Sequence, residues 1–197
     1  MRSKTEILQE HFNVQTFNEA FPTYLKELAS FPMPLSSWTK LQLPYEASSH
    51  PRIPSFDEID RAMKEDRLKG GASSDVCKVG TCVVKMSYNP IILQEAEDLL
   101  FLQANSQVRT PTVYAVFARE TKPSPAYYMV TEFIEGEMLT SKKWLSLSDK
   151  ARTKICSKLC EQLRLLRSIP SEGYYGRVHN QGWNPNSLPL RSNGKEM

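Results

Sequence analysis

VCKVGTCVVKM, residues 76–86, is the stretch that decides the fold. Residues 76–79 and 82–86 carry the branched side chains that strands favour, and Gly80 and Thr81 form a two-residue connection between them. Two such runs joined by two turn residues are typical of a β-hairpin. We therefore expect two antiparallel strands here, with a tight turn at Gly80.

Beyond this hairpin, the sequence predicts a helix, two more strands and a long second helix. An Asn-Pro pair at 89–90 is suited to begin a helix that runs to about residue 103. Residues 113–118 and 127–133 have the aromatic and branched content of strands. A helix over about 148–168 follows from an apolar residue every third or fourth position, and Pro170 ends it.

The two ends of the chain carry weaker patterns. Residues 1–55 are expected to form an irregular extension, because their many prolines interrupt regular structure. Ser55 is suited to open a short helix over 57–69, before the glycines at 70–71. Residues 171–197 are rich in Gly, Asn, Pro and Ser, and we expect them to form a loose tail.

Composition excludes several classes of function. With 40% hydrophobic and 24% charged residues among 197, the chain can bury a core. Its formal charge is only +3 and its basic residues are dispersed, which argues against a nucleic-acid partner. No apolar run is long enough to span a membrane, and the first residues lack the apolar core of a secretory signal. A cytoplasmic location is the expectation.

Four cysteines allow two interpretations. Cys156 and Cys160 are one helical turn apart and could present two thiolates to zinc on one helix face. Cys77 and Cys82, however, lie in the predicted hairpin at a spacing that matches no common zinc pattern. We favour reduced thiols with a structural role in the core.

The predicted strand and helix place a lysine near two glutamates. Side chains alternate along a strand, so Val83 and Lys85 share the face opposite to the one that packs in the core. Lys85 could reach phosphate oxygens there if an acidic residue on the next helix held it. Glu95 shares a stripe with the apolar residues of that helix, whereas Glu97 is turned away by roughly 200° and is expected to be solvated. We therefore expect Glu95 to be the partner of Lys85.

Five segments in this order resemble the aminoglycoside phosphotransferase and choline kinase-like family, within the protein kinase-like superfamily, in the version common among fungi. The matching segments are VGTCVVK (79–85), LQEAEDLLF (93–101), TPTVYAVF (110–117), YMVTEFIEG (128–136) and LRLLRSIP (163–170), followed by GYYG (173–176). The resemblance covers about residues 56–176.

The resemblance implies an α+β fold of the protein kinase type. Its N-terminal lobe is a small, mostly antiparallel sheet with one packed helix, and a hinge leads from it to a helical lobe that is truncated here. The implied organisation is an extension (1–55), an ATP-binding lobe with its hinge (56–136), a linker with the first helix of the second lobe (137–170) and a loose tail (171–197).

The resemblance also implies a nucleotide site. Lys85 is similar in position to the lysine that contacts the ATP phosphates, and Glu95 to its helix partner, while Val83 covers the base. The hinge implies that the carbonyl of Thr131 and the amide of Phe133 read the adenine edge, with Val130 behind the base. Residues 70–75 are the candidate for the phosphate-covering loop, although a flexible connector is an equal interpretation.

The catalytic part of the family pattern is absent from this sequence. Phosphoryl transfer requires a carboxylate for the substrate hydroxyl and ligands for Mg²⁺, and the family supplies them from a His-Gly-Asp loop and a later Asp. The histidines are His11, His50 and His179, and none begins a His-x-Asp motif. We therefore expect ATP binding without catalysis by this chain alone, and no Mg²⁺ ligands within it.

A second hypothesis is a non-catalytic module that binds nucleotide or another protein. The intact family would act on a small-molecule hydroxyl, whose identity the sequence does not indicate. The stripe formed by Ile155, Leu159, Leu163 and Leu166 has little to pack on in a lobe without its partner. We expect an exposed apolar surface there and self-association through it.

Overall fold

The computed structural model describes residues 3–16, 18–19, 35–69, 74–122, 124–170, 173 and 177–181. The helices are α1 (Lys4–Phe12), α3 (Phe56–Glu65), α4 (Ile91–Asn105), α5 (Ser141–Ser146) and α6 (Asp149–Arg167), with short 3₁₀ turns η1 (Leu35–Ser37) and η2 (Val178–Asn180). The strands are β1 (Tyr45–Glu46), β2 (Arg67–Lys69), β3 (Asp75–Val79), β4 (Cys82–Ser87), β5 (Val113–Arg119) and β6 (Ala126–Glu132).

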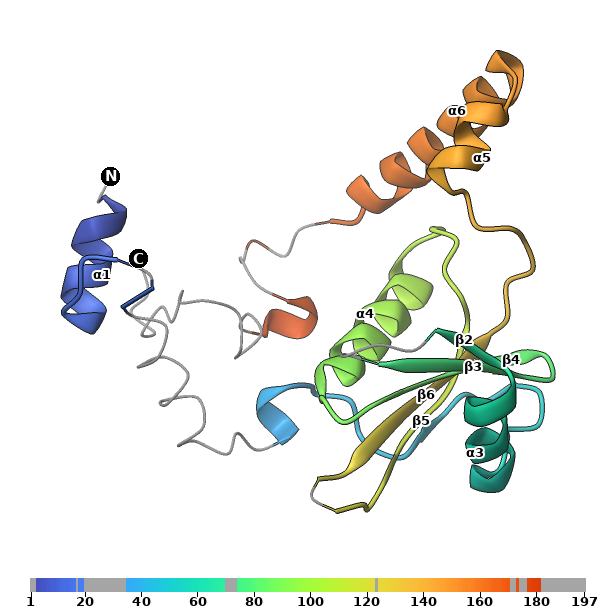
Figure 1. Cartoon of the computed structure of the whole chain (residues 1–197), viewed down its shortest axis with the longest axis horizontal. Coiled ribbons are helices and arrows are strands. Elements are labelled where there is room, and N and C mark those ends of the chain that lie inside the picture. Colours follow the sequence, from blue (N-terminus) through green and yellow to red (C-terminus); the bar gives the residue numbers. More distant parts are fainter. Residues whose placement is uncertain are drawn as a thin grey trace.

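All six strands form one antiparallel sheet in the order β1-β5-β6-β4-β3-β2. The two helices α3 and α4 lie on opposite faces of this sheet (Figure 1). Alternate residues of β6 show the division, because Val130 packs in the cluster with α3 and Met129 packs in the cluster with α4. The described lobe is therefore an α+β domain of three layers, whereas the sequence predicted one packed helix.

The predicted hairpin is confirmed by the structure. β3 and β4 pair from Val79 opposite Cys82 outward, and Gly80 has a φ of 59° in the turn between them. A positive φ is the conformation that glycine adopts without a steric penalty. The predicted helix after residue 89 and the two strands that follow it are also present, with ends shifted by two residues or fewer.

The helix predicted over 57–69 is shorter than expected. α3 ends at Glu65, and Arg67–Lys69 forms the edge strand β2 instead, with Arg67 opposite Cys77. The chain turns at Asp66, whose φ is −122°. Pairing with β3 gives the backbone of residues 67–69 partners in the sheet, and this tertiary contact outweighs their helix propensity.

Part of the predicted N-terminal extension belongs to the sheet domain. Trp38 and Thr39 are buried, and β1 adds a strand to the free edge of β5. In the predicted loose tail, residues 177–181 form a turn closed by two backbone hydrogen bonds between Arg177 and Gln181. Apart from Gly173, the other residues of that tail lie outside the described residues.

The start of α3 carries a capping box, as the position of Ser55 predicts. The Ser55 hydroxyl accepts from the amide of Glu58 at 3.4 Å, and the Glu58 carboxylate accepts from the amide of Ser55 at 2.8 Å. Arg52 also binds this carboxylate and, together with Ser55, lowers the pKa of Glu58 to about 2. Arg52, Ser55 and Glu58 thus stabilise the first turn of α3.

Ser55→Ala is expected to lower the free energy of unfolding by about 1 kcal/mol, because it removes the side-chain acceptor for the first turn of α3. Urea denaturation with a constant m-value measures the loss. Ser157→Ala, at an exposed position inside α6, is the matched control and should show no loss. Equal unfolding midpoints for the two variants would contradict the capping role.

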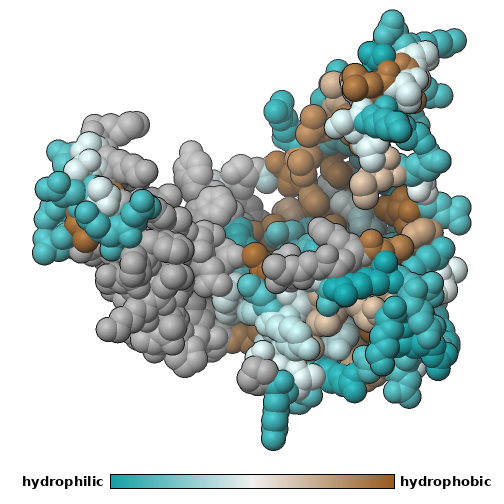
Figure 2. Space-filling view, viewed as in Figure 1, coloured by the Kyte–Doolittle hydropathy of each residue, from teal (hydrophilic) through white to brown (hydrophobic). Residues whose placement is uncertain are grey.

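The chain beyond β6 runs away from the sheet domain. α5 was not predicted; its N-cap is Thr140, whose hydroxyl accepts from the amide of Lys143 at 3.2 Å. α6 (Asp149–Arg167) is capped by Ser148, and its bounds are close to the predicted ones. None of its side chains is buried, and apolar side chains gather on the concave side between this arm and the sheet domain (Figure 2).

Three of the four residues of the predicted apolar stripe on α6 are exposed, and Ile155 is half-buried. Leu159, Leu163 and Leu166 expose between 43% and 56% of their surface. In the described part of the chain, no helix combines the length and apolar composition that a membrane crossing requires.

Candidate functional site

Lys85 and Glu95 form an ion pair across the face of the sheet that α4 covers. Lys85 projects from β4, and its Nζ lies 2.5 Å from Oε2 of Glu95 on α4. The side chain of Lys85 is 26% exposed and that of Glu95 is 46% exposed, so the pair is accessible to a ligand. The structure therefore brings together the two residues that the sequence paired.

The predicted orientations of the two glutamates on α4 are wrong. Glu95 is exposed, whereas Glu97, which was expected to be solvated, is buried. α4 packs on the sheet through Leu93 and Ala96, and a second surface made by residues 38–40 and Arg177 covers the side that carries Glu97. Sequence periodicity could not show this second surface, because its residues lie far from α4 along the chain.

The register of the sheet places Thr131, and not Val130, on the face that carries Lys85. Thr131 is the partner of Val83, and Met129 is the partner of Lys85. Paired residues of antiparallel strands project to the same face. Val130 is fully buried in the cluster with α3, on the opposite face, so its side chain does not fit the predicted position behind an adenine base.

The predicted hinge residues are also engaged within the fold. The amide of Phe133 donates to the carbonyl of Thr81 at 3.2 Å, and the amide of Glu132 donates to the carbonyl of Thr112 at 2.8 Å. The ring of Phe133 lies under the ammonium of Lys78, 3.8 Å from the ring centroid. After Glu132 and Phe133, Ile134 is the first described residue whose amide donates to no backbone carbonyl.

The candidate phosphate-covering loop is only partly visible. Residues 70–73 lie outside the described residues, Ser74 precedes β3, and Asp75 is its first residue. β2 and β3, which flank this loop, pair in antiparallel fashion. The segment therefore connects two neighbouring strands at the end of the sheet, a position that sequence reasoning could not assign because β2 was predicted as helix.

An open groove lies beside the ion pair on the outer side of α4. Its volume is about 410 Å³, and its lining residues are Ile91, Gln94, Glu95, Asp98, Leu99 and Leu102. Burial raises the pKa of the Asp98 carboxyl above its usual range. Nε2 of Gln94 is buried with no hydrogen-bond partner among the described residues. The groove thus combines apolar walls with one unsatisfied amide.

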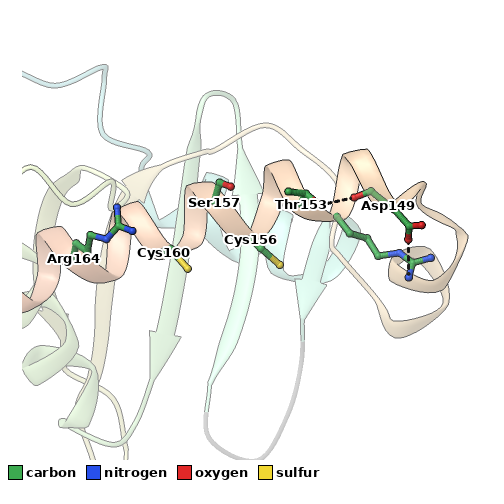
Figure 3. A pocket seen from close by; sticks show the side chains of 7 residues that line it. Asp149, Thr153, Cys156, Ser157, Cys160 and Arg164 are labelled. Atoms are coloured by element: carbon green, nitrogen blue, oxygen red, sulfur yellow. Dashed lines mark hydrogen bonds and ion pairs between the residues drawn. The ribbon is translucent and has the colours of Figure 1, made fainter.

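A second hollow lies along α6 and carries no site. It measures about 590 Å³, but all the residues that line it belong to α6 itself (Figure 3). Cys156 and Cys160 project from the same side of this helix, one turn apart (Figure 3). Both are exposed, so the predicted core role is wrong for them; Cys77 and Cys82 are buried as expected, and burial raises the pKa of Cys77 to about 11.

The described residues contain no group of three or more His, Cys, Asp or Glu side chains that could hold a metal ion. His179 is exposed, and its ring contacts that of Phe101 edge to face with centroids 5.8 Å apart. The residues described here therefore do not fit a magnesium site, whereas the accessible ammonium of Lys85 fits an anionic ligand such as a phosphate.

Comparison with known proteins gives little further information. No family model matches the chain, and no curated protein matches it. Among solved structures, the chain is similar to one described as a microcompartment-associated aminopropanol kinase, with 15% sequence identity and a TM-score of 0.37. That similarity covers 59% of this chain and 37% of the kinase, so the chain spans little more than a third of that protein's length.

Proposed function

We propose that this chain is the ATP-binding portion of a kinase-like phosphotransferase whose acceptor is a small-molecule hydroxyl. The ion pair between Lys85 and Glu95 is the observation that carries the proposal. A strand lysine held by a helix glutamate presents an ammonium at a defined position, as binding of the ATP phosphates requires. The resemblance of the five sequence segments supports the same interpretation.

The adenine would bind on the face of the sheet that carries Val83 and Thr131, which are register partners. Because the amide of Phe133 already donates to the carbonyl of Thr81, the groups beside it along the hinge would recognise the base. The candidates are the amide of Ile134, which donates to no backbone carbonyl of the described residues, and the carbonyl of Glu132, which accepts a long hydrogen bond of 3.5 Å from the Thr131 hydroxyl. Bound ATP would bring Mg²⁺ with it, and the described residues supply no ligand set for that ion.

We further propose that this chain alone does not transfer phosphate. None of its three histidines begins a His-x-Asp motif, so the positioned carboxylate of the resembling family has no counterpart in the sequence. Phosphorylation of an added small alcohol by the purified chain, above a control without protein, would disprove this part of the proposal.

MgATP is expected to raise the melting temperature of the wild-type chain and to have no such effect on Lys85→Ala. A ligand that binds only the folded state stabilises it, by about 2.7 kcal/mol at a hundredfold excess over its dissociation constant. Lys64→Ala is the matched control, since Lys64 is an exposed lysine on α3, against the opposite face of the sheet. This variant should keep the full shift.

Two results of that experiment would count against nucleotide binding at Lys85. An equal shift in wild type and Lys85→Ala would place the nucleotide elsewhere. A wild type with no shift at all would mean that the described lobe does not bind MgATP. Circular dichroism of Lys85→Ala, unchanged from wild type, is needed to show that the loss of a shift is not a loss of folding.

The exposed apolar surfaces favour a second candidate, a protein-interaction module. The leucines of α6 and the groove on α4 are both apolar and open. Surfaces of this kind mark sites of contact with other proteins. If this candidate holds, the chain should associate with itself or with another protein, and association should weaken in Leu163→Lys without any change in nucleotide binding. Sedimentation at several protein concentrations measures the first effect.

A further inference from the structure

Three segments that are distant in the sequence meet at the carboxylate of Glu97. The hydroxyl of Thr39 donates to Oε2 at 3.0 Å, and the backbone amide of Lys40 donates to Oε1 at 3.2 Å. From the other end of the chain, the guanidinium of Arg177 donates to Oε2 at 3.4 Å. The side chain of Glu97 therefore binds two residues that precede β1 in the chain and one residue that follows α6.

The ion pair between Arg177 and Glu97 is buried, unlike the pair between Lys85 and Glu95. The side chain of Arg177 is 9% exposed and that of Glu97 is 4% exposed. The second terminal nitrogen of Arg177 donates to the backbone carbonyl of Trp38 at 2.8 Å. Both charged groups thus have hydrogen-bond partners besides each other, which is the condition under which a buried ion pair is stable.

The segment that carries Arg177 is held at a second point. Nζ of Lys40 donates to the carbonyl of His179 at 2.5 Å, and the ring of His179 contacts Phe101 on α4. His179 and Asn180 both have a positive φ, which shapes residues 177–181 into a tight turn. This turn presents Arg177 to Glu97 in one orientation.

We infer that Thr39, Lys40, Glu97 and Arg177, which we call the Glu97 clasp, position α4 so that Glu95 meets Lys85. Arg177 is then a positioning residue of the candidate nucleotide site without contacting a ligand there. The reference to a nucleotide rests on the proposed function, whereas the link from the clasp to the ion pair does not.

Helix geometry supports this link. Glu95 and Glu97 are separated by roughly 200° around α4, so Lys85 and the clasp bind the helix from opposite sides. Apolar contacts through Leu93 and Ala96 hold α4 to the sheet but have little directional preference. At about 6 Å from the helix axis, a rotation of roughly 20° moves a carboxylate by about 2 Å. The directional bonds of the clasp oppose such a rotation.

The rate at which Lys85 reacts with an acetylating N-hydroxysuccinimide ester tests the inference without any nucleotide. Acylation requires the nitrogen of Lys85 to reach the carbonyl carbon of the ester, and the contact with Glu95 holds the nitrogen against the carboxylate instead. Peptide mass spectrometry reads the rate at Lys85, with the exposed Lys64 on α3 as the internal reference. Arg177→Met should raise the Lys85 rate severalfold, toward the rate in Glu95→Gln, and leave the Lys64 rate unchanged.

Two further variants separate positioning from a general loss of structure. Arg177→Lys keeps the charge, but a lysine cannot reach both Glu97 and the carbonyl of Trp38 as a guanidinium does. The acylation rate at Lys85 in this variant should therefore lie between the rates in wild type and in Arg177→Met. In a Glu95→Gln background, Arg177→Met should add nothing, because the interaction through which it acts is already absent. Arg61→Met, an exposed arginine on α3, is the matched control and should behave as wild type.

Two results would overturn the inference: a wild-type rate at Lys85 in Arg177→Met, or a further increase of that rate in the Glu95→Gln background. If Arg177→Met fails to fold, the acylation rates at Lys85 and Lys64 both rise. The rate at Lys85 in Arg177→Lys, compared with that in the wild type, then decides in the same way. Protection of Lys85 by MgATP in the wild type tests the proposed function separately. Absence of protection would count against nucleotide binding and leave the result on the clasp intact.

Discussion

Arg177→Met is expected to lower the free energy of unfolding by about 3 to 5 kcal/mol, one of the two largest effects expected of a single substitution in this chain. The substitution leaves the carboxylate of Glu97 buried, with only the hydroxyl of Thr39 and the amide of Lys40 as partners. It also removes the donor to the carbonyl of Trp38. An unpaired buried charge is far less stable than the same group in water.

A double-mutant cycle distinguishes the ion pair from simple loss of packing. Glu97→Leu alone should also be strongly destabilising, because it leaves the guanidinium of Arg177 buried. The double variant, with Arg177→Met and Glu97→Leu together, should lose much less than the sum of the two single losses. Chemical denaturation of all four proteins gives the coupling energy. A loss below about 1 kcal/mol in Arg177→Met would mean that water reaches the carboxylate when the turn at 177–181 is altered.

Ile59→Ala is expected to cost about 2 to 5 kcal/mol, because it opens a cavity between α3 and the sheet. Ile59 is fully buried in the cluster that contains Val84 and Val130. The neighbouring side chains come from paired strands and cannot close the space without distorting the ladder. The loss should therefore lie well above that of an ordinary surface substitution.

The matched control for this prediction is Ile91→Ala. Ile91 is 42% exposed at the first turn of α4, so the same change of chemistry should cost about 0.5 kcal/mol or less there. Thermal and urea unfolding of both variants measure the difference. Similar losses for the two isoleucines would show that α3 does not pack on the sheet as described.

The two clusters on opposite faces of the sheet have a consequence for the candidate site. The α3 face is closed by a helix and holds the fully buried side chains of Val84 and Val130. The α4 face is closed over Leu93 and Ala96 but leaves Lys85 partly exposed beside the helix. One face thus stabilises the lobe, and the other face keeps a charged group accessible to a ligand.

Local patterns in the sequence predicted most elements of the described lobe correctly. The hairpin at residues 76–86 depends on strand-forming side chains and a glycine turn, which act over a few residues. The capping residue Ser148 and the apolar period of α6 are local in the same sense. The pairing of Lys85 with Glu95 was predicted from an inward-facing helical stripe, and the structure shows the pair although Glu95 is exposed, so the partner was right and the reason for choosing it was wrong.

The errors have a common physical cause. Residues 67–69 form a strand because β3 offers them backbone partners, and Trp38 and Thr39 are buried because α4 and Arg177 cover them. Such effects arise between segments separated by many residues, so no short stretch of sequence contains both segments. The same holds for Val130, whose face was decided by the register between β4 and β6.

The sequence by itself determined where β3, β4, β5, β6 and α4 form, and which lysine and glutamate could pair. Only the tertiary structure decided that β1 and β2 extend the sheet, that a second helix covers it, that Thr39, Lys40 and Arg177 bind the buried Glu97, and that Thr131 replaces Val130 on the face of Lys85. The reason is that hydrogen-bonded turns and side-chain periods are set by neighbouring residues, whereas burial and register depend on which distant surfaces meet.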